Sequence, residues 1–304
     1  IAQPISAKVY ARTLDLPAPY VAEWARQQVQ GDFPDLYTAG YEIYTTIDAD
    51  MQAAGVAAMH KGLEKYDRGH GYRGPEQTAS DDVIALIKAE SAPATDLKTT
   101  RGLDTQLKAF EAELSETINP EILAPLTDIR TFSGMVAAIV TQVEKQEAIA
   151  YTADGQAHSL TRLNSLWARE YIDVDRRGPP LTSMAQVVSV GDIIRLQQRL
   201  SDTTKEVSWQ LAQLPKIQGA LVSLDPENGA VKALVGGYDF YRNQYNFALQ
   251  STRQPGSGFK PFLYSSAIGN GITPADVFLD APLVFEDKNL ESQYRPDNDN
   301  NRYN

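Results

Sequence analysis

Cysteine is absent from this 304-residue chain. Without a thiol the chain can form no disulfide, no thiolate zinc site and no cysteine nucleophile. Histidine is scarce as well: only His60, His70 and His158 occur, and their spacing matches no metal-ligand pattern. We therefore expect no metal site, and nothing in the sequence predicts a cofactor.

Positive charge and long hydrophobic runs are also in short supply. The chain has 28 Lys and Arg against 39 Asp and Glu, a formal net charge of -11. A surface that follows phosphates needs clustered Lys and Arg, so this balance argues against nucleic acid as a partner. No run of about 18 apolar residues is present, and no signal peptide opens the chain. Because the chain begins at Ile1 without a methionine, we expect it to be a piece of a longer protein.

What is present is an ordinary globular composition, with 42% hydrophobic and 22% charged residues, long enough for about two domains. Residues 14–29 predict a helix after a linker, and residues 41–48 predict a strand that runs into an alanine-rich helix. Residues 133–200 contain short β runs with turn signals between them, a pattern typical of a small barrel or sandwich. We place this second domain at residues 67–212, as an insertion into an α/β layer.

Residues 217–240 predict a β-hairpin. Two apolar strands flank residues 225–229, whose Asp-Pro and Asn-Gly pairs favour a tight reversal. Both strands are apolar almost throughout, so we expect them to be buried on both faces of a central sheet. Gly236 and Gly237 end the second strand, either as a simple strand end or because another group approaches the backbone closely there.

The stretch QPGSGFKPF, residues 254–262, is the strongest candidate for chemistry. A helix that begins near Gly256 would place Ser257 in its first turn, where unpaired N–H groups favour an oxyanion, and Lys260 one turn further on the same face. Lysine can take the proton of a serine if apolar neighbours disfavour its charge, and Phe259 and Phe262 flank Lys260. We expect Ser257 Oγ and Lys260 Nζ to lie within hydrogen-bond reach on a helix that the two phenylalanines bury. The alternative is a serine cap beside a surface lysine, since about one S-x-x-K arises by chance in such a chain.

Residues 219–262, GALVSLDPENGAVKALVGGYDFYRNQYNFALQSTRQPGSGFKPF, resemble the start of the transpeptidase domain of class A penicillin-binding proteins. Residues 41–59, YEIYTTIDADMQAAGVAAM, are similar to the segment that opens that domain. The HGYRGP segment and the β-rich insertion resemble the Gram-negative type that carries an OB-like domain. The resemblance covers nearly the whole chain.

The resemblance implies a fold and a division of the chain. The fold is α/β (α+β): part of a β-lactamase/D,D-peptidase-like transpeptidase domain with an inserted small OB-like β-barrel. Residues 1–40 would be a linker helix after a glycosyltransferase domain, and residues 41–66 would start the transpeptidase domain. Residues 67–212 would be the OB-like insertion, and residues 213–304 the N-terminal part of the transpeptidase domain.

The resemblance also implies an activity, D,D-transpeptidation of peptidoglycan. Ser257 matches the serine that a D-Ala-D-Ala stem peptide or a β-lactam acylates, Lys260 matches the candidate base, and the backbone N–H of Ser257 is half of the oxyanion hole. No cofactor is implied. The family further implies a bifunctional protein that also uses a lipid-linked precursor, partner proteins of cell-wall synthesis at the OB-like domain, and a periplasmic location with an anchor in the inner membrane.

The sequence departs from the family pattern after Lys260. The 44 residues that follow contain neither the S-x-N element nor the K-T-G strand that completes such a site. Two other interpretations stay open. One is a non-catalytic binding module that acts through the OB-like domain, because OB-folds are general binding platforms. The other is a relative of the serine β-lactamases, which share S-x-x-K but lack the large insertion.

Overall fold

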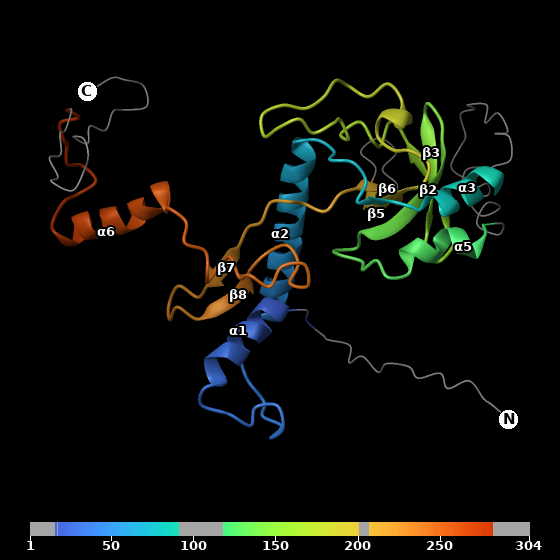
Figure 1. The fold of residues 1–304 in the computed structure, drawn as a ribbon. Coiled ribbons are helices and arrows are strands. Elements are labelled where there is room, and N and C mark those ends of the chain that lie inside the picture. Colours follow the sequence, from blue (N-terminus) through green and yellow to red (C-terminus); the bar gives the residue numbers. More distant parts are fainter. Residues whose placement is uncertain (1–15, 17, 91–117, 201–206, 282–304) are drawn as a thin grey trace, which may run out of the picture. The chain divides into compact units, whose positions relative to one another are not determined.

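The structure of the chain is a computed structural model that describes residues 16, 18–90, 118–200 and 207–281 (Figure 1). The chain divides into two compact units, Ile1–Ser251 and Thr252–Asn304. The first unit holds two groups of elements, which we call the sheet body and the hairpin body. In the described part of the chain, no helix combines the length and the apolar character needed to cross a membrane.

The sheet body is a six-stranded antiparallel sheet. Its strands run in the order β4–β3–β2–β5, and the far edge of β5 pairs with both β1 and β6. A register shift between Val140 and Gln142 interrupts the pairing of β2 with β3, and such a bulge increases the local twist of a sheet. The strands are β1 (Gln77–Thr78), β2 (Val136–Val143), β3 (Glu147–Thr152), β4 (Ala157–Thr161), β5 (Asp192–Leu200) and β6 (Val207–Ala212).

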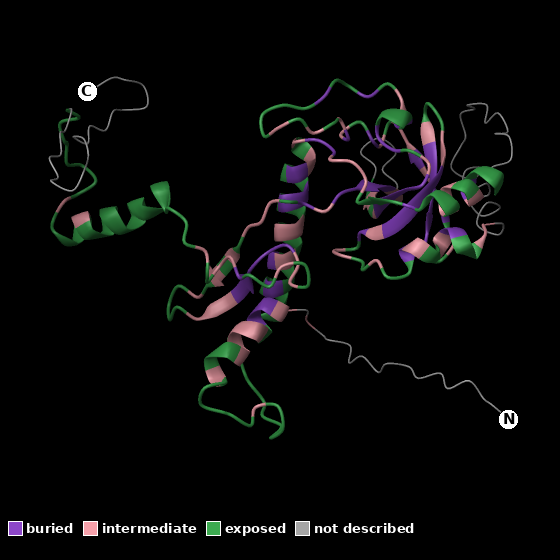
Figure 2. Ribbon diagram, in the orientation of Figure 1, coloured by how far each residue is buried: buried purple, intermediate pink, exposed green. Residues whose placement is uncertain are grey.

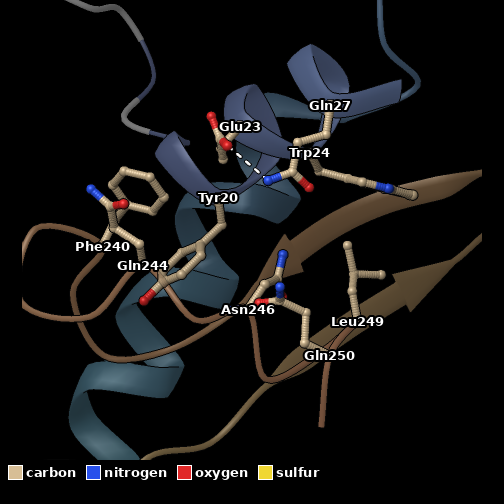
Figure 3. Close-up of a pocket in the computed structure, with 9 residues that line it drawn as sticks. All are labelled: Tyr20, Glu23, Trp24, Gln27, Phe240, Gln244, Asn246, Leu249 and Gln250. Carbon is tan, nitrogen blue, oxygen red and sulfur yellow. Dashed lines mark hydrogen bonds between the residues drawn. The ribbon is translucent and has the colours of Figure 1, made fainter. Parts of the chain in front are cut away.

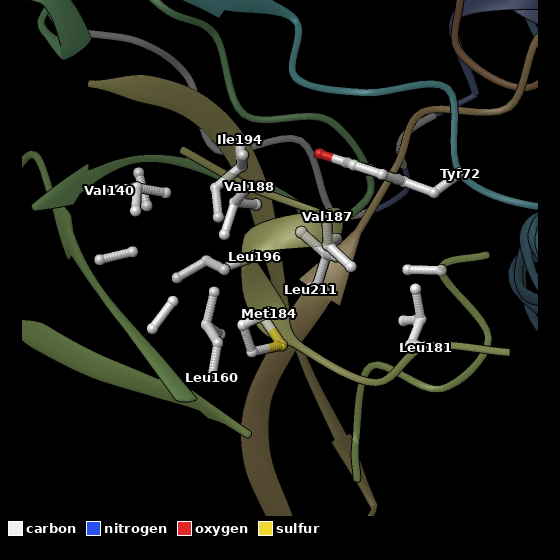
Figure 4. Close-up of a cluster of buried hydrophobic side chains, with 14 residues drawn as sticks. Tyr72, Val140, Leu160, Leu181, Met184, Val187, Val188, Ile194, Leu196 and Leu211 are labelled. Atoms are coloured by element: carbon white, nitrogen blue, oxygen red, sulfur yellow. The ribbon is translucent and has the colours of Figure 1, made fainter. Parts of the chain in front are cut away.

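Both faces of this sheet are covered. Successive side chains of a strand point to opposite faces, so Ala138 and Val140 of β2 join one cluster while Ala137 and Ile139 join the other. The first cluster includes Met184 of the turn η2 (Met184–Gln186) (Figure 4). Short helices cover the second: α3 (Asp81–Glu90), α5 (Pro120–Leu123) and the turn η1 (Ala124–Leu126). Figure 2 shows the resulting burial along β2 and β3.

The predicted barrel is wrong in one respect, because the sheet is not closed. Among the described residues no backbone ladder joins β4 to β6. The two strands instead approach through side chains: the rings of His158 on β4 and Trp209 on β6 lie with their centroids 5.1 Å apart. The strands β4 and β6 therefore meet through side chains and not through a backbone ladder.

The hairpin body contains the helices α1 (Pro19–Val29) and α2 (Ala49–Gly69) and the strands β7 (Leu221–Leu224) and β8 (Val231–Val235). The predicted hairpin and the two predicted helices are confirmed. Helix α2 packs closely on the hairpin at Gly55, where an added Cβ would lie 3.3 Å from Leu221 Cδ2. Asp48 caps α2, since its side chain accepts a hydrogen bond from the Met51 N–H.

Two predictions about this body are wrong. Residues 41–48 form no regular strand; they run extended into α2, and the Asp48 N–H donates to the carbonyl of Lys232 on β8. The hairpin is not buried on both faces either: Val222 and Leu224 of β7 are 46% and 57% exposed, whereas Leu234 of β8 is buried. The reason is that the hairpin is a sheet of only two strands. Helix α2 covers the face that carries Leu221, and on the other face α1 packs on Leu234 of β8 while Val222 and Leu224 of β7 stay exposed.

Candidate active site

The sequence QPGSGFKPF forms the start of a helix in the second unit, as predicted. Gly256 has a φ of +52°, a left-handed conformation that glycine adopts easily. Residues Gly256–Phe259 then form the 3-10 turn η3, which continues directly into α6 (Lys260–Gly269). Ser257 therefore lies in the first helical turn, where backbone N–H groups lack intrahelical acceptors and the helix dipole is positive.

The predicted burial of this helix is wrong. Phe259 and Phe262 are 57% and 69% exposed, and Ser257 and Lys260 are exposed as well. The two phenylalanine rings contact each other, with centroids 5.9 Å apart, rather than a core. In the described part of the second unit α6 is the single α-helix and no strand accompanies it, so there is no second layer to cover its apolar face.

Ser257 and Lys260 stand one turn apart, but their side chains are not engaged with each other. Across the described residues, no hydrogen bond joins Ser257 Oγ to Lys260 Nζ. The predicted contact is therefore not formed in this structure. Their roles as nucleophile and base stay predictions.

In the described part of the first unit, Tyr20 of α1 lines two hollows that the sequence did not reveal. A cavity of about 160 Å³ lies between α1, α2 and the end of β8, and His60 and Phe240 contribute to its walls. A smaller one, of about 40 Å³, lies between α1 and the loop around Asn246 and Leu249 (Figure 3). Neither is lined by Ser257 or Lys260.

Tyr20 explains the two glycines at the end of β8. An added Cβ on Gly236 would lie 2.5 Å from Asn246 Oδ1 and 2.8 Å from Tyr20 Cδ1, and one on Gly237 would lie 2.5 Å from the Tyr20 hydroxyl oxygen. Burial, with a smaller contribution from the Asp239 carboxylate, raises the pKa of Tyr20 to about 12. Its hydroxyl therefore stays protonated and donates a hydrogen bond of 2.7 Å to the carbonyl of Asn243. Of the two interpretations of these glycines, the close approach of another group is confirmed.

Comparison with known protein families identifies both parts of the chain. Residues 101–217 match the family model of the penicillin-binding protein OB-like domain, and residues 219–303 match that of the penicillin binding protein transpeptidase domain. The second match contains the hairpin β7–β8 as well as Ser257 and Lys260. An OB-like domain followed by a transpeptidase domain defines a penicillin-binding protein.

The relatives narrow the class. The chain is 38% identical over 304 residues to penicillin-binding protein 1A of Pseudomonas aeruginosa, covering all of this chain and 32% of the relative. It is 33% identical over 300 residues to penicillin-binding protein 1A of Escherichia coli K12, covering 98% of this chain and 31% of the relative. A crystal structure of penicillin-binding protein 1A from Haemophilus influenzae matches with a TM-score of 0.69 and 28% identity, over 96% of this chain and 36% of that one. The chain belongs to the class A penicillin-binding proteins of the 1A type, and it spans about a third of the length of these relatives.

Proposed function

We propose that the protein containing this chain is a serine D,D-transpeptidase that cross-links the stem peptides of peptidoglycan. The observation that carries the proposal is the S-x-x-K sequence at the start of a helix, within residues that match a transpeptidase domain. A serine in the first turn of a helix meets the positive end of the helix dipole, which favours the negative charge that develops during acyl transfer.

In this reaction Ser257 Oγ attacks the carbonyl carbon of the penultimate D-alanine, and its proton passes to Lys260 Nζ. The Ser257 N–H helps to hold the oxyanion. The peptide C–N bond then breaks and the leaving amine takes up the proton. D-alanine departs, and the rest of the stem peptide stays attached to Ser257 as an ester. An amine of a second stem peptide attacks this ester, which forms the cross-link and returns the proton to the serine. A β-lactam would acylate Ser257 in the same way and stay attached.

The rest of the proposed protein follows from its class. We propose that residues 1–40 link the transpeptidase domain to a glycosyltransferase domain that uses a lipid-linked precursor, and that residues 67–212 are an insertion between residues 41–66 and residues 213–304. The protein would be anchored in the inner membrane and face the periplasm. The OB-like domain would meet partner proteins of cell-wall synthesis.

A fluorescent penicillin tests the proposed reaction in the whole protein. We expect an adduct on Ser257, none in Ser257→Ala, and acylation slowed by about 10²–10⁴-fold in Lys260→Ala, which loses the proton acceptor. The matched controls are Ser265→Ala and Ser266→Ala on the same helix, which should label normally. An adduct on either control serine, or full labelling of Ser257→Ala, would refute the assignment. A whole protein that does not label at all would favour a binding module.

A further inference from the structure

Helix α2 presents a row of polar side chains at its C-terminal end. His60, Glu64 and Asp67 are spaced four and three residues apart, so they lie on one face of the helix. Glu64 and Asp67 are only 6% and 3% exposed. Charged side chains are rarely this buried unless they are paired. We call these three residues the α2 clamp.

Asp67 holds both segments that connect the sheet body to the hairpin body. Arg73, on the segment that leads into the sheet body, donates to both carboxylate oxygens, at 2.9 and 2.7 Å. On the segment that leads out, Gln213 Nε2 donates to the same carboxylate at 2.7 Å and the Lys216 N–H donates at 3.2 Å. One buried side chain therefore fixes the point where the chain leaves the hairpin body and the point where it returns.

The two connecting segments are also bonded to each other. The Arg73 N–H donates to Gln213 Oε1 at 3.1 Å, and Gln213 Nε2 donates to the Gly71 carbonyl at 2.8 Å. Gly71 has a φ of +103°, and an added Cβ there would lie 2.5 Å from the Arg169 carbonyl oxygen of the sheet body. The place where the two connecting segments meet at Asp67, which we call the joint, is thus tightly packed.

Glu64 links the sheet body to the residue that follows the hairpin. Its carboxylate accepts from Arg199 Nη2 of β5 at 2.6 Å and from the Tyr238 hydroxyl, three residues after β8, at 2.9 Å. Burial, and then the nearby Glu64 carboxylate, raises the pKa of Tyr238, so the phenol stays protonated as a donor. Any shift of Arg199 therefore pulls on a carboxylate that also holds Tyr238.

His60 makes a second bridge between the same parts. Its Nε2 lies 2.7 Å from the Tyr238 carbonyl, which can only accept, so this nitrogen carries the proton. In the neutral ring Nδ1 accepts from Ser133 Oγ, 2.8 Å away. Ser133, just before β2, has a φ of +48°, the only positive value for a non-glycine residue in the part of the chain that the structure describes. Such a backbone persists only where the surroundings enforce it.

We propose that the α2 clamp sets the orientation of the sheet body on the hairpin body and transmits displacements of the sheet body to the chain at residues 236–238. Domains within a chain generally move relative to each other unless their interface holds them. Here the interface combines an apolar cluster, which joins Leu63 of α2 to Met135 of the sheet body, with buried carboxylates that accept from donors of both bodies. The charge-assisted hydrogen bonds are directional, and we infer that they fix the geometry of the interface.

Spin-label distances test the first half of the proposal in the whole protein. The chain has no cysteine, so labels can be introduced at exposed Lys145 of the sheet body and exposed Glu227 of the hairpin turn, with any cysteine elsewhere in the protein replaced. We expect one narrow distance distribution that becomes broad in Asp67→Asn and Glu64→Gln. A control pair at Lys61 and Glu227 lies within the hairpin body and should not change. Asp50→Asn, at the exposed start of α2, should leave both pairs narrow.

Gln213→Ala keeps the distance test informative if a carboxylate variant does not fold, because it removes an uncharged donor from Asp67. Narrow distributions in all folded variants would overturn the proposed clamp.

Deuterium exchange tests the transmission. Arg199→Gln changes a side chain of the sheet body and breaks its contact with Glu64 of α2, so we expect the amides of residues 236–238 to exchange at least several-fold faster. Arg176→Gln is the matched control, since it breaks an exposed ion pair of the sheet body, with Asp173, that does not reach α2. Unchanged exchange at residues 236–238 in Arg199→Gln, or equal acceleration in Arg176→Gln, would overturn the proposed transmission.

Discussion

At the scale of single residues, Gly236 is a tightly constrained position of the hairpin body. Its place against Tyr20 and Asn246 leaves no room for a Cβ. We expect Gly236→Ala to lower the free energy of unfolding by about 1–3 kcal/mol, because a methyl group forced into a packed site displaces its neighbours. Chemical denaturation would measure the change.

Gly62 provides the control for this substitution. It lies within α2, and an added Cβ there would meet nothing within 4 Å. Gly62→Ala should therefore raise the free energy of unfolding by about 0.5–1 kcal/mol, since alanine favours a helix more than glycine does. Equal effects of the two substitutions would show that the contacts of Gly236 with Tyr20 and Asn246 do not matter.

A second residue, His158, predicts a pH dependence of the sheet body. Burial lowers the pKa of His158 below its ordinary value of 6.5, although the Asp154 carboxylate opposes the shift. The unfolded chain therefore binds a proton near pH 6.5 that the folded chain does not take up, so protonation favours unfolding. We expect stability to fall as the pH drops below about 6.5, and thermal unfolding between about pH 7.5 and pH 5.5 should detect it.

Two variants separate His158 from other titrating groups. His158→Gln should reduce the loss of stability between about pH 7.5 and pH 5.5. His70→Gln, at the end of α2, should show the same loss as the unchanged protein. The carboxyls of Glu147 and Asp192 have raised pKa values through burial, so their protonation favours the folded state and acts in the opposite direction. A pH slope that is unchanged in His158→Gln would contradict the assignment.

At the scale of secondary-structure elements, the start of α2 depends on one side chain. The Asp48 side chain accepts a hydrogen bond from the Met51 N–H at 2.9 Å, and the Asp48 N–H donates one to the Lys232 carbonyl of β8. Asp48→Ala should destabilise the hairpin body by about 1 kcal/mol through loss of the helix cap, while Asp48→Asn should retain most of the stability. Urea denaturation compares them; an alanine variant as stable as the asparagine variant would argue against the cap.

The elements themselves could be predicted from the sequence because their signals are local. Helix α1 follows from its proline start and apolar spacing, α2 follows from its alanine content and apolar spacing, and the hairpin follows from its Asp-Pro and Asn-Gly turn. The start of the helix at Ser257 also follows from the Pro-Gly pair before it. These features depend on residues that are close together in the chain.

Contacts between elements could not be predicted in the same way. Glu64 and Asp67 look like solvated helix charges, because their donors Arg199 and Gln213 lie 135 and 146 residues away in the sequence. The predicted burial around Ser257 was wrong for the same reason. A serine and a lysine at helical spacing show where a helix can begin, but they do not show which other elements cover that helix.

At the scale of the whole molecule, the division into two units makes a prediction about truncation. The unit Thr252–Asn304 is compact by itself, and α6 is exposed along its length. A chain that ends at Ser251 should therefore show the same thermal unfolding transition as the 304-residue chain. A lower transition temperature in the shortened chain would reveal that the second unit supports the first. Calorimetry gives the direct comparison.

The joint at Asp67 has a further consequence, for how such a protein can be rearranged. Because Gly71 and Gln213 are hydrogen-bonded to each other, the sheet body starts and finishes at nearly the same point in space. A segment with adjoining ends can be removed, exchanged or enlarged without stretching the chain on either side. The sheet body can therefore be exchanged as a unit. We expect that a short turn between residues 71 and 213 can replace it, with α2 still packed on the hairpin in the same way.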